Sequence, residues 1–284
     1  MFYLKYRPKT ISEIDNSRVR DILKKILEGK NLPHALLFIG QKGTGKTSAA
    51  RIFAKAVNCL GNKFNQISSS IEPCGKCTNC LAIDRSVSTD VLEMDAASNR
   101  GIEEIKNLIR EAAFLPMKTK FRVFIIDEAH MITHEGFNAL LKTLEEPPKT
   151  AIFILATTNP EKVPKTIASR CLKVNFGKAK KEDVISMLKR ITKMENLPYD
   201  DKFLSLIANH SEYSFRDAAK LLEELAIQKI IDFEAAENFL GIRGKNNFRQ
   251  LIEKADLKKT LAWIGEFSQG GGDFKNLIEQ ALDE

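Results

Sequence analysis

The stretch ALLFIGQKGTGKT, residues 35–47, decides the fold of this chain. Its first five residues form an unbroken apolar run, which is typical of a strand buried on both faces of a parallel sheet. Residues 40–47 then fit the pattern G-x-x-x-x-G-K-[ST] at every fixed position, and residues 48–57 continue with helical periodicity. A strand, a glycine-rich turn and a helix in this order predict a loop that binds phosphate groups.

The chemistry of such a loop gives each position a role. Glycines let the backbone curve until its N–H groups point inward at phosphate oxygens. Lys46 would bring a positive charge to the β and γ phosphates of ATP, and Thr47 would offer a hydroxyl to Mg²⁺, while the helix dipole attracts the anion. A chance glycine turn with a surface lysine is the alternative, which the flanking elements disfavour. The residues predicted to bind nucleotide here are Gly40, Gly43, Thr44, Gly45, Lys46, Thr47 and Ser48.

Residues 123–128, VFIIDE, supply an acidic partner for this loop. The apolar run indicates a second buried strand, which we expect to lie next to the strand of residues 35–39. Asp127, at its carboxyl end, is then placed to hold the Mg²⁺ shell, and Glu128 suits polarisation of an attacking water. A solvated acidic pair is the alternative. The next two residues complete a DEAH string, as in some helicases, but no other helicase signal accompanies it.

Four of the five cysteines have the spacing of metal ligands, C-x14-C-x2-C-x2-C. Two interlocked C-x2-C turns and one remote thiolate can close a tetrahedral four-sulfur site, which suits structural Zn²⁺. A redox pair and an iron–sulfur cluster are the competing interpretations. The fifth, Cys171, is expected to be a packed small residue. The predicted ligands are Cys59, Cys74, Cys77 and Cys80.

Strand and helix patterns alternate in the first part of the chain and then give way to helices alone. Alternation predicts a parallel α/β sheet with helices on both faces. Further strands are predicted at residues 91–94, 151–156 and 173–176, and further helices at 102–113 and 135–145. Beyond these, helical periodicity covers residues 180–194, 201–210, 214–230 and 233–240, and then 248–254, 257–267 and 274–282.

Composition agrees with a protein of two or three such units. The chain has 284 residues, of which 43% are hydrophobic and 29% charged, the balance of a globular protein. The 44 basic residues exceed the 37 acidic ones by seven, a mild hint of an anionic partner. No window resembles a signal peptide or a membrane span, so we expect a cytoplasmic protein without a membrane partner.

In their order along the chain, these motifs resemble those of the gamma/tau subunits of the bacterial DNA polymerase III clamp loader, which are AAA+ ATPases. The resemblance covers residues 1–241 closely and weakens beyond. Besides the phosphate loop, it is carried by residues 4–8 (LKYRP), 73–75 (PCG), 93–98 (EMDAAS), 137–148 (FNALLKTLEEPP), 156–160 (ATTNP), 169–171 (SRC) and 214–218 (SFRDA).

The resemblance implies a three-part organisation. Residues 1–177 would form the AAA+ core with a zinc-binding insert at residues 59–80, and residues 178–241 a small all-helical lid domain. Residues 242–284 would be a partial helical collar segment for oligomerisation. The family's collar normally runs much further, so we expect a truncated or minimal version here.

The resemblance also implies roles that spacing alone does not. Arg170 would be an arginine finger that reaches into the ATP site of a neighbouring subunit, where a cation stabilises charge on the phosphoryl oxygens. A simple surface arginine is the alternative. Thr158 matches the sensor at the end of a central strand, and Arg216 the lid arginine that contacts the γ-phosphate.

Two further regions are implied to contact ligands. Tyr6, Arg7 and Pro8 match the N-terminal segment near the adenine. Arg100 matches the region that follows the DNA backbone, with a helix-capping loop as the alternative. Residues 14–17 (IDNS) are one residue shorter than the family's Val-Gly-Gln-like stretch, which puts adenine contacts there in doubt.

The function implied is that of an ATP-hydrolysing subunit that opens a sliding clamp and loads it onto primed DNA, without transferring nucleotides itself. Its cofactors would be ATP, Mg²⁺ and Zn²⁺. Its partners in a hetero-oligomeric ring would be delta, delta-prime and further gamma/tau copies, together with the sliding clamp, primer–template DNA and polymerase III core. The alternative is a non-hydrolysing structural subunit of the delta-prime type, but such subunits lose the residues that stand here as Lys46, Asp127 and Glu128.

Overall fold

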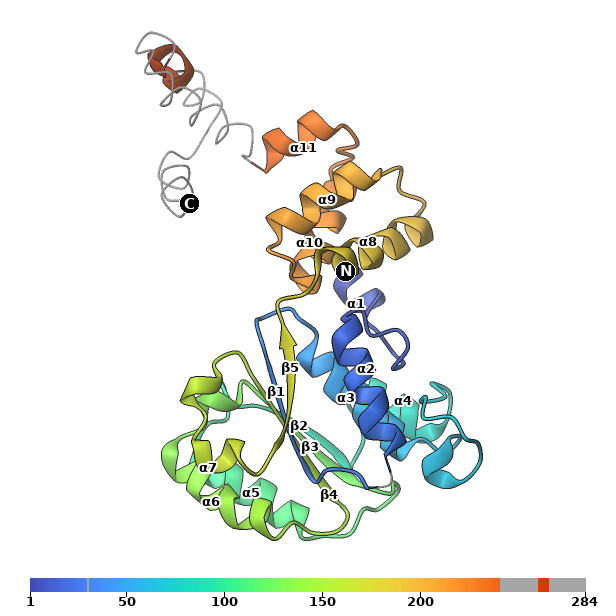
Figure 1. The fold of residues 1–284 in the computed structure, drawn as a ribbon, viewed down its shortest axis with the longest axis vertical. Coiled ribbons are helices and arrows are strands. Elements are labelled where there is room, and N and C mark those ends of the chain that lie inside the picture. Colours follow the sequence, from blue (N-terminus) through green and yellow to red (C-terminus); the bar gives the residue numbers. More distant parts are fainter. Residues whose placement is uncertain (30, 241–259, 266–284) are drawn as a thin grey trace.

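A computed structural model describes residues 1–29, 31–240 and 260–265. Its centre is a five-stranded, all-parallel sheet of order β2-β3-β4-β1-β5. A helical bundle lies beyond the carboxyl ends of the strands (Figure 1). The strands are β1 (Ala35–Gly40), β2 (Val91–Asp95), β3 (Arg122–Asp127), β4 (Ala151–Thr157) and β5 (Leu172–Gly177).

The apolar strand sequences follow from burial on both sheet faces. Successive side chains of a strand point to opposite faces, so Leu36 and Phe38 of β1 join one core cluster while Ala35 and Leu37 join the other. Strands β3 and β4 alternate in the same way. A continuous apolar run is therefore what a central strand between two layers of helices requires.

Two groups of helices cover the two faces of the sheet, as Figure 1 shows. One face is covered by α2 (Ser17–Glu28) and α3 (Lys46–Asn58). The opposite face is covered by α5 (Ile102–Ala112), α6 (His134–Glu145) and the short α7 (Lys165–Ala168). The predicted parallel α/β class is thereby confirmed.

The expected neighbour relation between β1 and β3 is wrong. Strand β4 lies between them and pairs in parallel with both. The acidic end of β3 still reaches the phosphate loop because α3, which begins in that loop, packs across β1, β4 and β3. Strand order thus follows from the crossover connections, which the apolar runs alone do not encode.

The cysteine insert contains a helix that the sequence pattern did not predict, α4 (Thr78–Asp84). Cys77 is its N-cap residue, and the Cys77 sulfur accepts a hydrogen bond from the N–H of Cys80. On the sheet side, the fully buried Lys55 of α3 extends its ammonium to Asp84, at 2.7 Å. This ion pair attaches the insert to the helix that follows the phosphate loop.

The bundle comprises α8 (Lys181–Glu195), α9 (Asp201–His210), α10 (Phe215–Ile227) and α11 (Phe233–Phe239). It has its own apolar core. Helix α10 ends three residues before the predicted residue 230, because the chain turns through a left-handed backbone conformation at Lys229 (φ 55°). The N-terminal helix α1 (Phe2–Lys5) packs on this bundle, although its residues precede the sheet in sequence.

The predicted collar, residues 242–284, lies outside the described residues except for 260–265, which are helical. None of the described helices combines the length and apolar character that crossing a bilayer requires.

Asp90, just before β2, organises the entry into two strands. Its fully buried carboxylate accepts hydrogen bonds from the backbone N–H groups of Met117, Lys118 and Thr119, at 2.8–3.0 Å. Its carbonyl oxygen accepts another from Val123. Burial acts to raise the pKa of Asp90, but the three N–H donors outweigh it and hold the pKa below the ordinary 3.8.

We predict that Asp90→Asn lowers the free energy of unfolding by about 1–3 kcal/mol, because an amide N–H would face backbone donors. The exposed change Asp201→Asn is the matched control. A carboxyl group whose pKa is lower in the folded than in the unfolded state stabilises the fold at pH values above its unfolded pKa. This contribution is lost as the pH falls through the folded pKa. In urea unfolding, the difference between wild type and Asp90→Asn should shrink below about pH 4; a constant difference would contradict this account.

Candidate functional site

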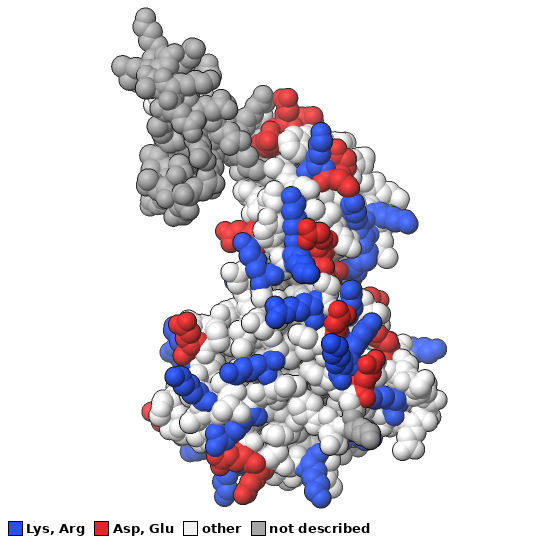
Figure 2. Space-filling view, in the orientation of Figure 1, with Lys and Arg blue, Asp and Glu red and all other residues white. Residues whose placement is uncertain are grey.

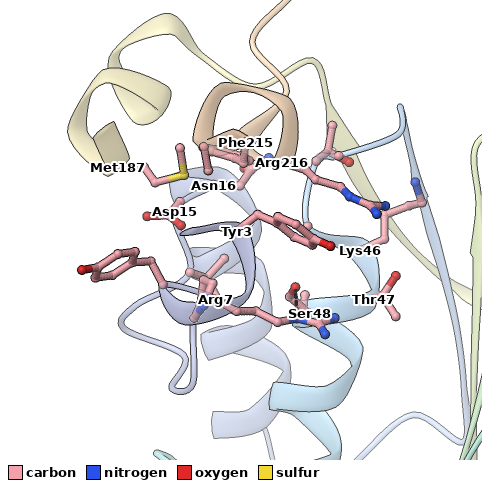
Figure 3. A pocket seen from close by; sticks show the side chains of 18 of the residues that line it. Tyr3, Arg7, Asp15, Asn16, Lys46, Thr47, Ser48, Met187, Phe215 and Arg216 are labelled. Atoms are coloured by element: carbon pink, nitrogen blue, oxygen red, sulfur yellow. Dashed lines mark hydrogen bonds between the residues drawn. The ribbon is translucent and has the colours of Figure 1, made fainter. Parts of the chain in front are cut away.

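One cavity of about 420 Å³ lies between the sheet and the bundle, and its residues come from both (Figure 3). It brings together residues more than 200 positions apart in the sequence, from Tyr3 to Arg216. Asp127 lines it as well. Of the residues predicted to bind nucleotide, those that line the cavity are Tyr6, Arg7, Pro8, Gly43, Thr44, Gly45, Lys46, Thr47, Ser48 and Arg216.

The phosphate loop has the backbone that its glycines allow. Gly43 and Gly45 adopt positive φ angles of 77° and 93°, a region that costs other residues strain. Gly40 lies outside the cavity lining, and a side chain there would collide with Phe176 of β5. The Lys46 ammonium donates hydrogen bonds to the carbonyl oxygens of Gly40 and Gln41, at 2.9 and 3.0 Å. The backbone of the loop therefore holds the Lys46 ammonium on the inner side of its turn.

Lys46 is almost fully buried, and burial lowers its pKa, while the carboxylates of Glu128 and Asp127 act in the opposite direction. Beside it, the Thr47 hydroxyl donates a hydrogen bond of 2.6 Å to Asp127 Oδ2. A hydroxyl and a carboxylate oxygen at this separation are suitable ligands for Mg²⁺. The residues present thus fit the divalent ion that nucleotide chemistry needs.

Glu128 follows Asp127 in a left-handed backbone conformation, φ 46°. For a residue other than glycine this costs free energy, and such conformations gather at functional sites. Its Oε2 accepts a hydrogen bond of 3.0 Å from the hydroxyl of Thr158 and lies 3.4 Å from Nδ1 of His130. Glu128, predicted to polarise the attacking water, and Thr158, the predicted sensor, are therefore in direct contact.

Part of the cavity lining is apolar and comes from the N-terminal segment and α8. Its residues include Pro8, Ile14, Met187 and Ile191. Asp15 also lines it, and burial raises the pKa of this carboxyl to about 6, although Arg190 of α8 pairs with it at 2.7 Å. Such a surface suits a flat heterocycle. The shortened stretch of residues 14–17 thus contributes directly to the cavity.

Several contributors escaped the sequence analysis. Arg51 and Glu93 form a two-pronged ion pair, at 2.6 and 2.8 Å, on the cavity wall. Arg51 stands four residues after Thr47 on α3, a helical spacing that could have indicated it. Arg7 and Ser48, which the sequence did predict, contact each other: the Arg7 guanidinium donates to the Ser48 hydroxyl at 2.8 Å, and burial lowers the pKa of Arg7.

The bundle approaches the phosphate loop closely. A Cβ atom on Gly43 would lie 2.0 Å from the hydroxyl oxygen of Ser214, the N-cap residue of α10. Arg216, two residues further on, has its guanidinium carbon 5.2 Å from the centre of the Tyr3 ring. Figure 3 shows this guanidinium extending toward the Lys46 end of the cavity. Tyr3 is a further residue that the sequence analysis missed.

Arg170 and Arg100 do not reach the cavity of their own chain. The Arg170 guanidinium pairs with Glu145 at the end of α6 and donates to the carbonyl oxygen of Thr166. Arg100 is exposed in the loop before α5. In the view of Figure 2, basic and acidic side chains are interspersed over the sheet domain and the bundle. Net charge thus identifies no binding face in that view.

The four clustered cysteines meet as their spacing predicts. Their sulfur atoms all lie within 4.8 Å of one another. Backbone N–H groups point at three of the sulfurs, as they do around thiolate ligands. Burial acts to raise the pKa of Cys74, but the backbone N–H groups of Lys76 and Cys77, together with hydrogen bonds to the Cys59 and Cys77 side chains, lower it to about 7. The donor set is compatible with zinc. Cys171 lies elsewhere and is buried.

Comparison with known proteins agrees with this geometry. Residues 15–180 match a family described as "DNA polymerase III, delta subunit". DNA polymerase III subunit gamma of Buchnera aphidicola (subspecies Schizaphis graminum) is 37% identical over 98% of this chain and 77% of its own length. Subunit tau of Bacillus subtilis is also 37% identical over 99% of this chain, which spans only 50% of that longer protein.

The fold has solved counterparts as well. The RuvB Holliday junction branch migration motor of Thermotoga maritima superimposes with a TM-score of 0.59, at 17% identity, over 97% of this chain and 91% of RuvB. At that identity the likeness concerns the fold alone. The family follows from the closer relatives: this chain belongs to the gamma/tau subunits of DNA polymerase III.

Proposed function

We propose that this chain binds ATP with Mg²⁺ and hydrolyses it as a motor subunit of the DNA polymerase III clamp loader. The observation that carries the proposal is the arrangement at the carboxyl edge of the sheet. There a buried lysine, a threonine paired with an aspartate, and a glutamate held by a second threonine lie at the ends of neighbouring elements, and a lid arginine, Arg216, lines the same cavity as the lysine, the first threonine and the aspartate.

Each residue has a definite task in this proposal. Lys46 and the loop N–H groups bind and orient the β and γ phosphates, and Thr47 and Asp127 hold the metal ion. The ion would neutralise charge on the phosphate oxygens. Glu128 takes up a proton from, or orients, the attacking water, and Thr158 sets the direction of the Glu128 carboxylate.

A complete hydrolytic site would need one more cation at the γ-phosphate, and we assign it to Arg170 of a neighbouring copy. Arg170 pairs with Glu145 outside the cavity of its own chain. It could therefore reach only the ATP site of a second subunit. Binding of ATP would then be autonomous, whereas efficient hydrolysis would depend on assembly.

In the assembled loader, ATP binding and hydrolysis would drive the opening of a sliding clamp and its release on primed DNA, in the cytoplasm. The gamma and tau relatives support a place in the polymerase III complex with delta, delta-prime and further gamma/tau copies. We assign residues 1–177 to the ATPase core, 178–241 to the lid and 242–284 to the collar. The exposed Arg100 would contact DNA phosphates.

A non-hydrolysing structural role is the weaker candidate. Such a subunit has no need of a buried lysine in its phosphate loop or of a paired acid and sensor. In this chain Lys46, Asp127 and Glu128 are all present and hydrogen-bonded within the loop or to its neighbours. Their geometry favours hydrolysis.

We also propose that the four cysteines hold one structural Zn²⁺. All four tetrahedral positions would be filled by sulfur, so the ion would leave no position for a substrate. The ion would stabilise the fold of the insert, and the Lys55–Asp84 ion pair would fix the folded insert to α3.

Lys46→Ala should lower ATP affinity by about a hundredfold, because it removes a charged donor from the phosphates. Titration of the isolated chain with a fluorescent ATP analogue measures this. The exposed Lys42→Ala in the same loop is the matched control and should bind as wild type does. Unchanged binding by Lys46→Ala would refute the nucleotide site.

Arg170→Ala should leave ATP affinity unchanged and lower the turnover number of the assembled, DNA-stimulated complex by about a thousandfold or more. The exposed arginine of α5, changed as Arg110→Ala, serves as the control. Steady-state phosphate release measures both. Normal turnover in an Arg170→Ala complex would show that Arg170 does not act as an arginine finger.

Purified chain should contain about one zinc per molecule by elemental analysis, as one S4 site binds one ion. Cys77→Ser should lower the zinc content and the melting temperature, while Cys171→Ser, at the buried thiol outside the cluster, should retain the metal. Equal zinc content in the two variants would contradict the assignment.

A further inference from the structure

The ring of Tyr3 lies against two cations of α10. The guanidinium carbon of Arg216 lies 5.2 Å from the ring centroid, and the ammonium of Lys220 lies 5.5 Å from it. Both distances fall within the range of cation–π attraction. Arg216 and Tyr3 line the nucleotide cavity, whereas Lys220 lies outside its lining. Figure 3 shows the Tyr3 ring beside Arg216 in the middle of the cavity.

The helix that carries Tyr3 is fastened to the bundle on both sides of this residue. The N-terminal ammonium and the N–H of Phe2 both contact the Glu223 carboxylate, at 3.2 and 2.9 Å. Lys5 and Tyr6 both donate to Glu195. The Tyr3 ring therefore belongs to the lid side of the cavity and keeps its position relative to α10.

Among the described residues, two arginines of the cavity have no carboxylate partner, and they differ in what they contact: Arg7 donates to the Ser48 hydroxyl, whereas Arg216 lies against the Tyr3 ring. Arg51, Arg170 and Arg190 each form an ion pair with a carboxylate. Within the described part of the chain, no carboxylate lies within ion-pair distance of Arg216, and its recorded partner is the Tyr3 ring. A ring face attracts a guanidinium without occupying its N–H groups, which lie in the guanidinium plane. A carboxylate would occupy those donors and cancel the charge.

We propose that Tyr3 is a positioning residue that holds the Arg216 guanidinium toward the terminal phosphate of the bound nucleotide while leaving its N–H donors available. The inference rests on the proposed ATP site and deepens it. It makes the N-terminal helix part of the device that distinguishes ATP from ADP. Tyr3 acts through Arg216 and takes no part in the chemistry itself.

The test measures the affinities of the isolated full chain for a non-hydrolysable ATP analogue and for ADP, both with Mg²⁺. Tyr3→Leu should weaken binding of the ATP analogue about two- to fivefold, the usual size of one cation–π contact, and leave ADP affinity unchanged. Tyr3→Phe keeps the ring and should bind as wild type does. Lys220→Met removes the other cation on the same ring and should change neither affinity.

A double-mutant cycle identifies the route of the effect. In an Arg216→Met background, Tyr3→Leu should cause no further loss of affinity for the ATP analogue, because the residue it positions is gone. Tyr3→Met, which keeps a long apolar side chain against the bundle, repeats the measurement should Tyr3→Leu melt at a lower temperature than wild type.

Three results would overturn the inference: wild-type affinities in both Tyr3→Leu and Tyr3→Met, an equal loss of affinity for the ATP analogue and ADP in these variants, or a full additional loss in the Arg216→Met background. An equal loss would mean that Tyr3 only packs against the base or the lid. None of these results touches the proposed function, which fails instead if Lys46→Ala binds nucleotide normally.

Discussion

The hydrogen bond between Thr47 and Asp127 is the contact on which the site depends. It joins the first turn of α3 to the end of β3, although β4 separates that strand from β1. The bond can form only if α3 crosses three strands at a suitable distance from the sheet. That distance requires the small buried residues on the inner face of α3, among them Ala49 and Ala50. Close packing of α3 on the sheet thus sets the geometry of the proposed metal and phosphate site.

The electrostatics of the cavity favour a polyanion. Burial lowers the pKa of both Lys46 and Arg7, which means that the surrounding groups do not fully compensate the loss of hydration of these cations. The facing carboxylates are engaged, since Asp127 accepts from Thr47 and Glu93 pairs with Arg51. A bound triphosphate would supply the missing negative charge and so draw the core and the lid together.

The sequence predicted those parts of the site that a local pattern encodes. The phosphate loop and the four cysteines need only fixed spacings within one segment, and the structure brings residues 43–47 of the loop together in the cavity wall and the four sulfurs within 4.8 Å of one another. The sequence did not predict those features of the site that depend on tertiary arrangement. The insertion of β4 between β1 and β3 is a property of crossover connections. Tyr3 and Arg51 gain their places only because distant elements pack beside them.

The bounds of the helices show the same division. The sequence predicts a helix that begins at residue 214, and α10 begins one residue later, with the Ser214 hydroxyl capping it by accepting a hydrogen bond from the N–H of Asp217. Its end was misjudged by three residues, because periodicity continues through Ile230 while the backbone turns at Lys229. A capping side chain is a local chemical signal, whereas a left-handed turn at lysine has no such signal, because glycine usually takes this position.

The two arginines that we assign to the γ-phosphate are kept ready in different ways, and the difference fits where each would act. Arg216 faces its own cavity against a neutral ring, so an arriving phosphate has no ion pair to displace. Arg170 stands in a partly exposed ion pair with Glu145. Exposed ion pairs of this kind are worth only about 0–1 kcal/mol, so exchanging Glu145 for a phosphate of the next subunit costs little. The ion pair would therefore occupy Arg170 in the free chain without preventing its proposed use as a finger on assembly.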